Sequence, residues 1–431
     1  MPFLWVSDAK AARVDEAVLA SRLCPYSATL AVLDMPLGGR LWHTPIVTSS
    51  LEMPAQKSKC SAWGRIERLP GGVRFSTDPL GTLPLWKITR PGFTALAAEA
   101  KAFAALDGVT LQLKSFDELT ALGERPIDWS PYLNVERLPP GSRWEAGPTW
   151  REVTPSPWQE LLATRGASTD TAALGDALAS ALEGDSVQGA FISGGIDSSI
   201  AAALIHARHT WSLGTRAGNE FAQAAQLAQH LGSAHHETQL LDEDIVALWN
   251  DVIRANEIFD GMTAEIVLQL ASLVKAAGAI GITTGYGADL LFGGMLRHEA
   301  YLDAVGVRTT RGLIARTLWS GELSPFFAWQ HGVTLHPVFW SQQVIRAALS
   351  LDPSIHFDGT HEKVPLRRLA VSRGWLTEPL AFRAKVGMTV GTAAYQLVAQ
   401  QLGLLNEMDY AGRSRLATKR LLLELEKHAA G

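Results

Sequence analysis

The residues with the clearest chemical signature lie together in the middle of the chain. In order they are Gly189, Ala190, Phe191, Ile192, Ser193, Gly194, Gly195, Ile196, Asp197, Ser198 and Ser199. An apolar strand here runs into a turn with two glycines and then into a helix, so backbone N–H groups and the positive helix end can surround phosphate oxygens. The turn lacks the lysine of the common Gly-x-x-x-x-Gly-Lys loop and carries Asp197 instead. Because a carboxylate beside a polyphosphate needs a divalent cation between them, we assign Asp197 to Mg²⁺. The competing interpretation is a plain strand-to-helix turn in which Asp197 interacts only with the helix dipole.

Alternating elements along the C-terminal part of the chain would position this turn. The pattern predicts strands over residues 187–192 and 210–215, and helices over residues 170–182, 198–208 and 219–231. Such alternation is typical of an α/β fold with a doubly wound parallel sheet, in which ligands bind at the carboxyl ends of the strands. The remainder is expected to be mostly helical and to end in a charged helix over residues 413–430.

The first third of the chain has a different pattern. Short β-rich runs at residues 27–33 and 71–77 are separated by frequent glycine and proline turns, and a high density of alanine predicts a helix at about residues 94–106. This pattern indicates an antiparallel α+β domain. A loop rich in Pro, Ser and Thr at residues 154–169 is the expected boundary, which divides the chain into domains 1–160 and 161–431.

Composition and charge exclude several classes of protein. The chain has 431 residues, of which 47% are hydrophobic and 19% charged, as in globular proteins. Its 38 Lys and Arg against 43 Asp and Glu give a net charge of −5, which argues against a nucleic-acid partner. No apolar run reaches the ~18–20 residues of a membrane span, and the first residues have no basic segment that leads into an apolar stretch. We therefore expect no secretory signal, no membrane partner and a cytoplasmic location. Two cysteines, Cys24 and Cys60, cannot build a disulfide framework or a cysteine-rich metal site.

The glycine-rich turn resembles the pyrophosphate-binding loop of the N-type ATP pyrophosphatases, the PP-loop enzymes. Further matching segments are Leu213-Gly214-Thr215, Asn219-Glu220-Phe221 and the stretch Thr284-Gly285-Tyr286-Gly287-Ala288-Asp289-Leu290-Leu291-Phe292-Gly293-Gly294, as in the asparagine synthetase branch. The resemblance implies a PP-loop, adenine-nucleotide hydrolase-like sheet that binds ATP and Mg²⁺. It implies nucleotide contacts from the turn, Leu213 and Gly285, phosphate contacts from Lys363, and metal ligation by Asp197 and Asp289.

Within this branch, four segments resemble the β-lactam synthetase and carbapenam synthetase group. They are Tyr286 in the second metal segment, residues 256–265, residues 319–323 and residues 383–387. The resemblance implies that Tyr286, oriented by Glu322, takes a proton from the attacking amine, and that Lys385 stabilises the oxyanion and the leaving phosphate of AMP. Residues 388–391 depart from the His-Glu-Gly of the group, which bears on the identity of the substrate. Carboxylates at Glu257, Asp260 and Glu265 are candidates for reading cationic groups of the substrate, or for capping and surface roles.

The N-terminal third resembles the glutaminase-like, N-terminal-nucleophile domain of the same family. The matching stretches are residues 76–86 and 99–102. A working glutaminase needs a cysteine directly after the initiator methionine, whereas this chain has Pro2. We therefore expect a degenerate, catalytically inactive α+β domain.

The resemblance as a whole implies an ATP-dependent intramolecular amide (β-lactam) synthetase in antibiotic or toxin biosynthesis. Such an enzyme adenylates a substrate carboxylate, releases pyrophosphate, and closes the ring through the substrate's own amine with release of AMP. The expected substrate is a small β-amino acid. Alternatives that stay open are a lasso-peptide cyclase acting on a peptide substrate, an ammonia-dependent asparagine synthetase-like ligase, and a nucleotide-binding module without turnover. The ring formed, the pathway and the formation of a homo-oligomer are also left open.

Overall fold

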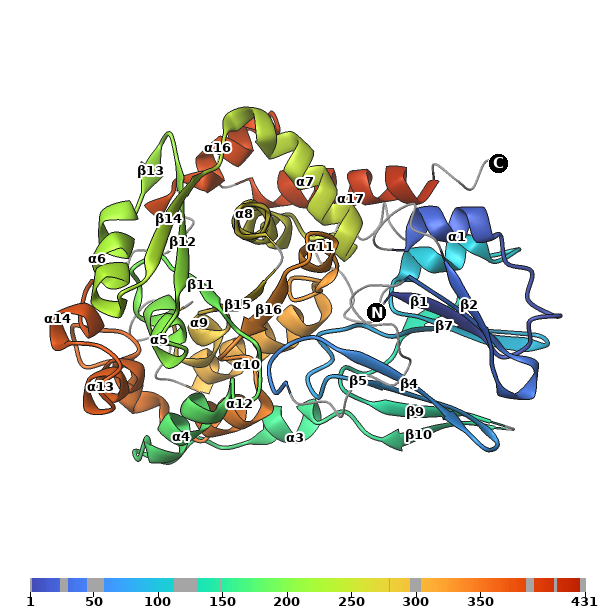
Figure 1. Ribbon diagram of the computed structural model, residues 1–431, viewed down its shortest axis with the longest axis horizontal. Coiled ribbons are helices and arrows are strands. Elements are labelled where there is room, and N and C mark those ends of the chain that lie inside the picture. The colour runs from blue at the N-terminus through green and yellow to red at the C-terminus, as the bar shows by residue number, and fades with distance from the viewer. Residues whose placement is uncertain are drawn as a thin grey trace.

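The computed structural model describes residues 2–23, 30–44, 58–111, 130–147, 149–278, 280–294, 304–384, 391–406 and 409–426. Residues up to about 154 form two antiparallel sheets, seen at the right of Figure 1. The first sheet has the order β2 (Ala31–Asp34), β3 (Arg40–His43), β1 (Phe3–Val6), β7 (Phe93–Ala97), β6 (Trp86–Arg90) and β8 (Val135–Arg137). The second has the order β10 (Trp150–Thr154), β9 (Arg143–Ala146), β5 (Gly72–Thr77) and β4 (Gly64–Leu69).

The helix expected at residues 94–106 is wrong over its first half. Residues 93–97 are strand β7, which lies between β1 and β6, and a short 3₁₀ helix, η2 (Ala100–Ala105), follows it. Ala95, Leu96 and Ala97 are fully buried in this central position. The error arose because small apolar residues suit a strand that is covered on both faces as well as they suit a helix. The antiparallel α+β character of the region is confirmed.

The rest of the chain is built on a sheet that is mostly parallel. Five parallel strands run in the order β14 (Ala234–Gln239), β12 (His209–Thr215), β11 (Gly189–Phe191), β15 (Gly281–Thr284) and β16 (Thr334–Pro337), and β13 (Gly218–Asn219) adds an antiparallel hairpin to β12. The strand order reverses between β11 and β15. In parallel α/β sheets, such a reversal opens a crevice at the carboxyl ends of the two strands. The expected parallel sheet is therefore present, and the glycine-rich turn follows one strand at the reversal.

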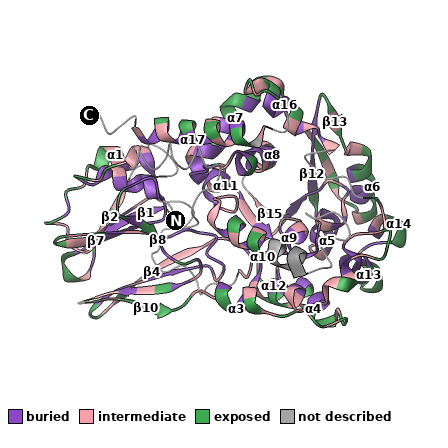
Figure 2. Cartoon of the chain, turned by 180° about the vertical axis from the view of Figure 1, so that it is seen from behind, coloured by how far each residue is buried: buried purple, intermediate pink, exposed green. Residues whose placement is uncertain are grey.

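Helices surround this sheet, and Figure 2 shows that most of its strands β12 and β15 is buried. The main helices of this part are α3 (Trp158–Ala163), α4 (Ala172–Ser180), α5 (Ile196–Leu204), α6 (Phe221–Leu231), α7 (Asp242–Asn256), α8 (Gly261–Ala277), α9 (Ala288–Leu291), α10 (Ala304–Trp319), α11 (Phe326–Gln330), α12 (Gln342–Leu349), α13 (Val364–Ser372), α14 (Glu378–Ala381), α16 (Ala394–Gln401) and α17 (Tyr410–Glu426). The expected linker at residues 154–169 contains α3, because Trp158 and Leu161 are buried and supply an apolar face. The proposed division between residues 160 and 161 thus falls inside a helix.

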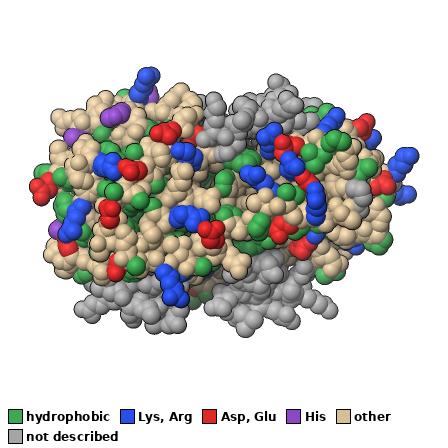
Figure 3. Space-filling model, turned by 90° about the horizontal axis from the view of Figure 1, so that it is seen from below, with side chains coloured by type: hydrophobic (Ala, Val, Ile, Leu, Met, Phe, Trp, Pro, Cys, Tyr) green, Lys and Arg blue, Asp and Glu red, His purple; other side chains and the backbone are tan. Residues whose placement is uncertain are grey.

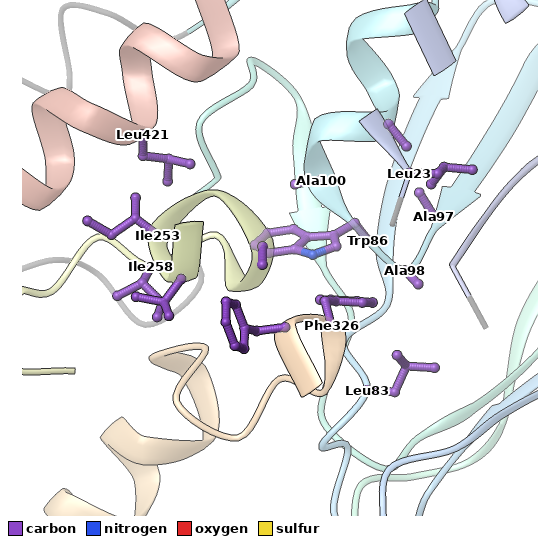
Figure 4. Close-up of a cluster of buried hydrophobic side chains, with 14 of the residues drawn as sticks. Leu23, Leu83, Trp86, Ala97, Ala98, Ala100, Ile253, Ile258, Phe326 and Leu421 are labelled. Atoms are coloured by element: carbon purple, nitrogen blue, oxygen red, sulfur yellow. The ribbon is translucent and has the colours of Figure 1, made fainter. Parts of the chain in front are cut away.

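The two parts of the chain share one apolar core. Side chains from both parts converge in Figure 4, including Trp86 and Ala100 from the first and Ile258 and Phe326 from the second. Each of these four residues is at most 4% exposed. The N-terminal part is therefore packed against the other as closely as the layers within a single domain.

Polar contacts at helix ends reinforce this interface. The carboxylate of Glu257, which follows α7, accepts hydrogen bonds from the backbone N–H groups of Ala100 (2.9 Å) and Lys101 (2.6 Å) at the start of η2. In the opposite direction, Arg22 at the end of α1 (Glu16–Arg22) donates to the backbone carbonyls of Glu424 and Leu425 near the end of α17. Orphan backbone groups at helix ends thus find charged partners across the interface.

A third polar contact joins the parts through Cys60, Asp185 and His336. His336 Nδ1 lies 3.2 Å from Asp185 Oδ2, the Ser58 hydroxyl donates to the same carboxylate oxygen at 2.9 Å, and the Cys60 sulfur lies 4.0 Å from it. Burial raises the pKa of the Cys60 thiol, first through desolvation and then through the charge of Asp185. The side chains therefore form a hydrogen-bonded cluster around one carboxylate.

On the face shown in Figure 3, positive and negative side chains are interspersed. Among the residues that the structure describes, no helix combines the length and apolar character needed to cross a bilayer.

Candidate active site

The glycine-rich turn connects β11 to α5, as predicted. Gly194 has a φ of +77°, and a Cβ added to it would lie 2.6 Å from the Cβ of Gln223 on α6, so glycine is required there. The Ser198 hydroxyl accepts a hydrogen bond from the Ser193 N–H (3.1 Å) and donates to the Gly195 carbonyl (3.2 Å). These contacts hold the turn in a compact shape with its N–H groups at the start of a nine-residue helix. Such a helix start favours an anionic ligand.

Asp197 and Asp289 occupy equivalent positions after neighbouring parallel strands. Asp197 is in the first turn of α5 after β11, and Asp289 is in the first turn of α9 after β15. Gly285 lets the two turns approach, because a Cβ there would lie 2.5 Å from the backbone nitrogen of Ser198. The structure therefore brings together two aspartates that are 92 residues apart in the sequence.

Lys363 places its ammonium group between the two carboxylates. Its Nζ lies 2.6 Å from Asp289 Oδ1 and also contacts Asp197 Oδ2. The side chain is fully buried, and the residue precedes α13 with a φ of +57°. Burial alone would lower the pKa of Lys363, but the two carboxylates outweigh it and hold the pKa above its ordinary value.

This arrangement fits a divalent cation at the same place. One cation already contacts both carboxylates, and hard carboxylate oxygens are the ligands that Mg²⁺ prefers. Space around Asp289 is tight, because a Cβ on Gly294 would lie 2.0 Å from its Oδ1 and 2.6 Å from Lys363 Cε. Lys363, which was expected to contact the phosphates, contacts the two aspartates in this structure.

Tyr286 and Glu322 also meet at this site. Tyr286 lies three residues before Asp289, and its hydroxyl makes hydrogen bonds with Glu322 and with Thr317 near the end of α10. Its ring packs edge-on against Trp340 with 6.2 Å between the ring centroids. Burial, followed by the Glu322 charge, raises the pKa of Tyr286 well above its ordinary value. Burial likewise raises the pKa of Glu322 to about 7, and the hydrogen bond from Tyr286 partly counteracts this rise.

The remaining predicted site residues are Ile192, Leu213 and Lys385. Ile192 and Leu213 are buried near the carboxyl ends of β11 and β12. Lys385 lies outside the described residues. Its neighbour Arg383 donates to the Gln223 carbonyl (3.1 Å), and its Nη1 would lie 3.1 Å from a Cβ on Gly194. The segment leading to Lys385 therefore passes beside the glycine-rich turn.

The three acidic residues considered as readers of a cationic substrate have protein partners instead. Glu257 accepts hydrogen bonds from the start of η2, Asp260 caps α8 and pairs with Arg316 (2.6 Å), and Glu265 pairs with the fully buried Arg413 (2.9 Å). Capping by Asp260, three residues from its partner, is one of the roles that the sequence left open. The partners of Glu257 and Glu265 are 157 and 148 residues away, so the sequence pattern could not reveal them. Sequence reasoning gave no role to Thr317, which lies two residues before the matched segment 319–323, or to Arg383, which begins the matched segment 383–387. It also missed Trp340, for which no local signal exists.

The paired histidines of β14 do not form a metal cluster with other described residues. His235 lies between the hydroxyls of Thr210 (2.9 Å) and Ser212 (3.1 Å), and His236 contacts His209 at 3.3 Å. The strand pairs with β12 on one side, as expected for a strand near the sheet edge.

Comparison with known proteins identifies relatives of this site. The asparagine synthase family model matches residues 171–322, a range that includes Asp197, Tyr286, Asp289 and Glu322. Carboxyethyl-arginine beta-lactam-synthase of Streptomyces clavuligerus is 30% identical over 334 residues, which cover 74% of this chain and 62% of that protein. The glutamine-hydrolyzing asparagine synthetase of Brassica oleracea is 26% identical over 58% of this chain and 48% of its own length. Asparagine synthetase B of Escherichia coli K12 is 27% identical over 62% of this chain and 55% of its own length.

The chain thus spans about half to three fifths of the length of these relatives. The match begins just before α4, includes both aspartate-bearing turns, and ends at Glu322. Residues 171–322, which carry both aspartate-bearing turns, therefore form an asparagine synthase domain.

Proposed function

We propose that this protein is an ATP-dependent C–N ligase that closes a β-lactam ring. In this proposal a PP-loop sheet follows a degenerate, N-terminal-nucleophile-like domain. The substrate is a small β-amino acid, whose carboxylate is adenylated with release of pyrophosphate. Its own amine then displaces AMP.

The observation that carries the proposal is the contact between Tyr286 and Glu322 beside the two aspartates. Adenylation needs the glycine-rich turn and the two aspartates, so these features are expected in any adenylating ligase of this kind and do not distinguish one product from another. A buried hydroxyl–carboxylate pair adds a route for removing a proton from an amine. The similarity to a β-lactam synthase over 74% of the chain supports the same choice.

In the first half-reaction, the turn from Ser193 to Gly195 would bind the β- and γ-phosphates through its N–H groups. Asp197 and Asp289 would hold Mg²⁺, which offsets the charge that develops on the departing pyrophosphate. Lys363, whose ammonium lies between the two aspartates, would exchange this contact for the phosphates once Mg²⁺ is bound. The substrate carboxylate can then attack the α-phosphorus with its charge repulsion reduced.

In the second half-reaction, the amine must lose a proton as it attacks the acyl-adenylate. The high pKa of Tyr286 keeps its hydroxyl protonated in the resting site. Tyr286 therefore acts as a relay, accepting the amine proton while passing its own to Glu322. With a pKa of about 7, Glu322 is ionised above neutrality and able to receive that proton. Lys385 would stabilise the tetrahedral oxyanion and the AMP phosphate. Because the nucleophile belongs to the same molecule, the reaction also avoids the entropic cost of a second encounter.

The test is to incubate the protein with ATP, Mg²⁺ and a panel of β-amino acids, and to follow nucleotides and products. We expect AMP and pyrophosphate in equal amounts, together with a product lighter than the β-amino acid by one water. Asp197→Ala should abolish pyrophosphate release, whereas Asp176→Ala, an exposed carboxylate of α4, should not. Release of ADP and phosphate, or formation of an open-chain amide from added ammonia, would contradict the proposal.

A further inference from the structure

Arg137 is a buried arginine of the N-terminal part that reaches the other part of the chain. It ends strand β8 and is 8% exposed. Its Nη2 donates to the backbone carbonyl of Leu318, 181 residues away, at 2.9 Å. The guanidinium also lies over two indole rings, with its Cζ 4.9 Å from the ring of Trp319 and 5.7 Å from that of Trp86. Trp86 is its cross-strand neighbour on β6.

These contacts fix the C-terminal end of α10. The last carbonyls of a helix have no partners within it, and a cation there also interacts favourably with the helix dipole. Two cation–π contacts add orientation, because a planar guanidinium stacks well on aromatic rings. Arg137 therefore constrains Leu318 and Trp319 together.

The same helix end carries the partners of Tyr286. Thr317, directly before Leu318, makes a hydrogen bond with the Tyr286 hydroxyl. After Trp319 the chain turns, with the Ser320 hydroxyl donating to the Thr317 carbonyl (3.0 Å) and accepting from the Glu322 N–H (3.2 Å). A continuous series of contacts thus runs from the guanidinium to the carboxylate that faces Tyr286.

Little free space separates these groups. A cavity of about 10 Å³ lies at this junction and is lined by Arg137, Thr317, Gly321 and Trp340, among others. It has room for about one water molecule. Gly321 is tightly placed as well, because a Cβ there would lie 2.7 Å from the Asn256 carbonyl. A shift of the α10 end would therefore be passed on to Glu322 rather than absorbed by a loose loop.

We propose that Arg137 is a positioning residue for the Tyr286–Glu322 pair, so that the N-terminal part of the chain completes the ring-closing half of the site. This inference rests on the proposed function of the pair. The N-terminal part then contributes to synthesis without catalysing a reaction itself. The contacts of Arg137 with Leu318, Trp319 and Trp86 lie on the ring-closing side of the site, so adenylation should not depend on them.

The chain offers a matched control in Arg22. This arginine is also buried at the interface and also donates to the last carbonyls of a helix in the other part. That helix is α17, and its end carries no residue of the proposed site. Arg22→Ala therefore removes the same kind of contact without disturbing α10.

The experiment compares Arg137→Ala, Arg137→Lys and Arg22→Ala in the two half-reactions. We expect Arg137→Ala to slow product formation by about tenfold to a hundredfold, as for a misplaced catalytic group, while pyrophosphate release changes by less than about threefold. Arg137→Lys should recover part of the loss, since its ammonium can reach the Leu318 carbonyl but cannot stack on the indoles. Arg22→Ala should leave both rates near those of the wild type.

Two further measurements distinguish a positioning role of Arg137 from a general disturbance of the fold. If Arg137 acts through Glu322, adding Arg137→Ala to Glu322→Gln should cost no more than Glu322→Gln alone. If the losses from the two substitutions multiply in the double variant, or if both half-reactions slow equally, the inference is wrong.

A tyrosinate absorbance titration, taken as wild type minus Tyr286→Phe, needs no substrate and so is independent of the proposed activity. Its midpoint should shift in Arg137→Ala and not in Arg22→Ala, and an unchanged midpoint would also overturn the inference.

Discussion

The hydrogen bond from the Tyr286 hydroxyl to Glu322 connects two groups whose ordinary pKa values differ widely. Burial raises both values, and the structure keeps the proton on the tyrosine. Removal of the hydroxyl in Tyr286→Phe interrupts the route without changing the packing of the ring against Trp340. We expect ring closure to slow by about a hundredfold or more, in the range of general acid–base catalysis, while adenylation stays within a few-fold. Rapid-quench measurement of pyrophosphate and cyclised product distinguishes the two steps, and ring closure at the wild-type rate would disprove the relay.

The pH dependence of ring closure follows from the pKa of Glu322. The carboxyl group can accept a proton when it is ionised, which is above about pH 7 because burial raises its pKa to that value. The rate should therefore be highest above neutrality and fall about tenfold for each pH unit below about pH 6. Single-turnover rates between pH 5 and 9 provide the test. In Glu322→Gln the remaining slow rate should lose this inflection, and an unchanged inflection would assign it to another group.

At the level of elements, the site depends on how closely the turn after α9 approaches the aspartates. A Cβ at Gly294 would meet both Asp289 Oδ1 and Lys363 Cε. Gly294→Ala should therefore push the carboxylate away from its position and weaken Mg²⁺-dependent ATP binding by about tenfold or more, because ion ligation tolerates little displacement. Gly312→Ala, in the middle of α10 with open space around it, is the control and should raise helix stability slightly. Equilibrium binding of ATP with Mg²⁺ measures the difference, and equal affinities in the two variants would count against the metal site.

The success of the sequence predictions at this level has a physical basis. The turn after β11 was predictable because a strand–turn–helix pattern places side chains at the carboxyl edge of a parallel sheet. The segment with Asp289 was found through its resemblance to the asparagine synthetase branch, because no pattern indicated the strand β15 before it. The strand in place of the helix at residues 94–106 was not, because alanine is compatible with both when neighbouring strands cover it. The pairing of Glu265 with Arg413 joins residues 148 apart, which local patterns do not encode. Sequence reasoning gave no role to Arg137 for the same reason, because its hydrogen-bond partner Leu318 lies on α10, 181 residues away.

For the whole molecule, the shared core predicts cooperative unfolding. Buried side chains such as Trp86 and Phe326 belong to one apolar cluster although they come from different parts of the chain. We expect a single calorimetric transition rather than one for each part. Two well-separated transitions would show that the interface contributes less than its burial indicates.

Glu257 provides a way to weaken that interface. Its carboxylate is 7% exposed and accepts two backbone hydrogen bonds from η2. Glu257→Ala leaves two buried N–H groups without partners and should lower the free energy of unfolding by about 3 kcal/mol. Asp251→Ala, on the exposed side of the same helix α7, should change it by less than about 0.5 kcal/mol. Urea denaturation of both variants gives the comparison, and similar stabilities would mean that the contact across the interface is dispensable.

The position of the Lys363 ammonium between two aspartates determines how these carboxylates are stabilised before a nucleotide binds. Two carboxylates that share one small space repel each other unless a positive charge accompanies them. Because this charge is covalently attached, it is present in every copy of the chain whatever the ionic composition of the surroundings. In the proposed function, ATP would thus bind to a site that formed when the chain folded, and Mg²⁺ would replace the ammonium as the charge that keeps the two carboxylates together.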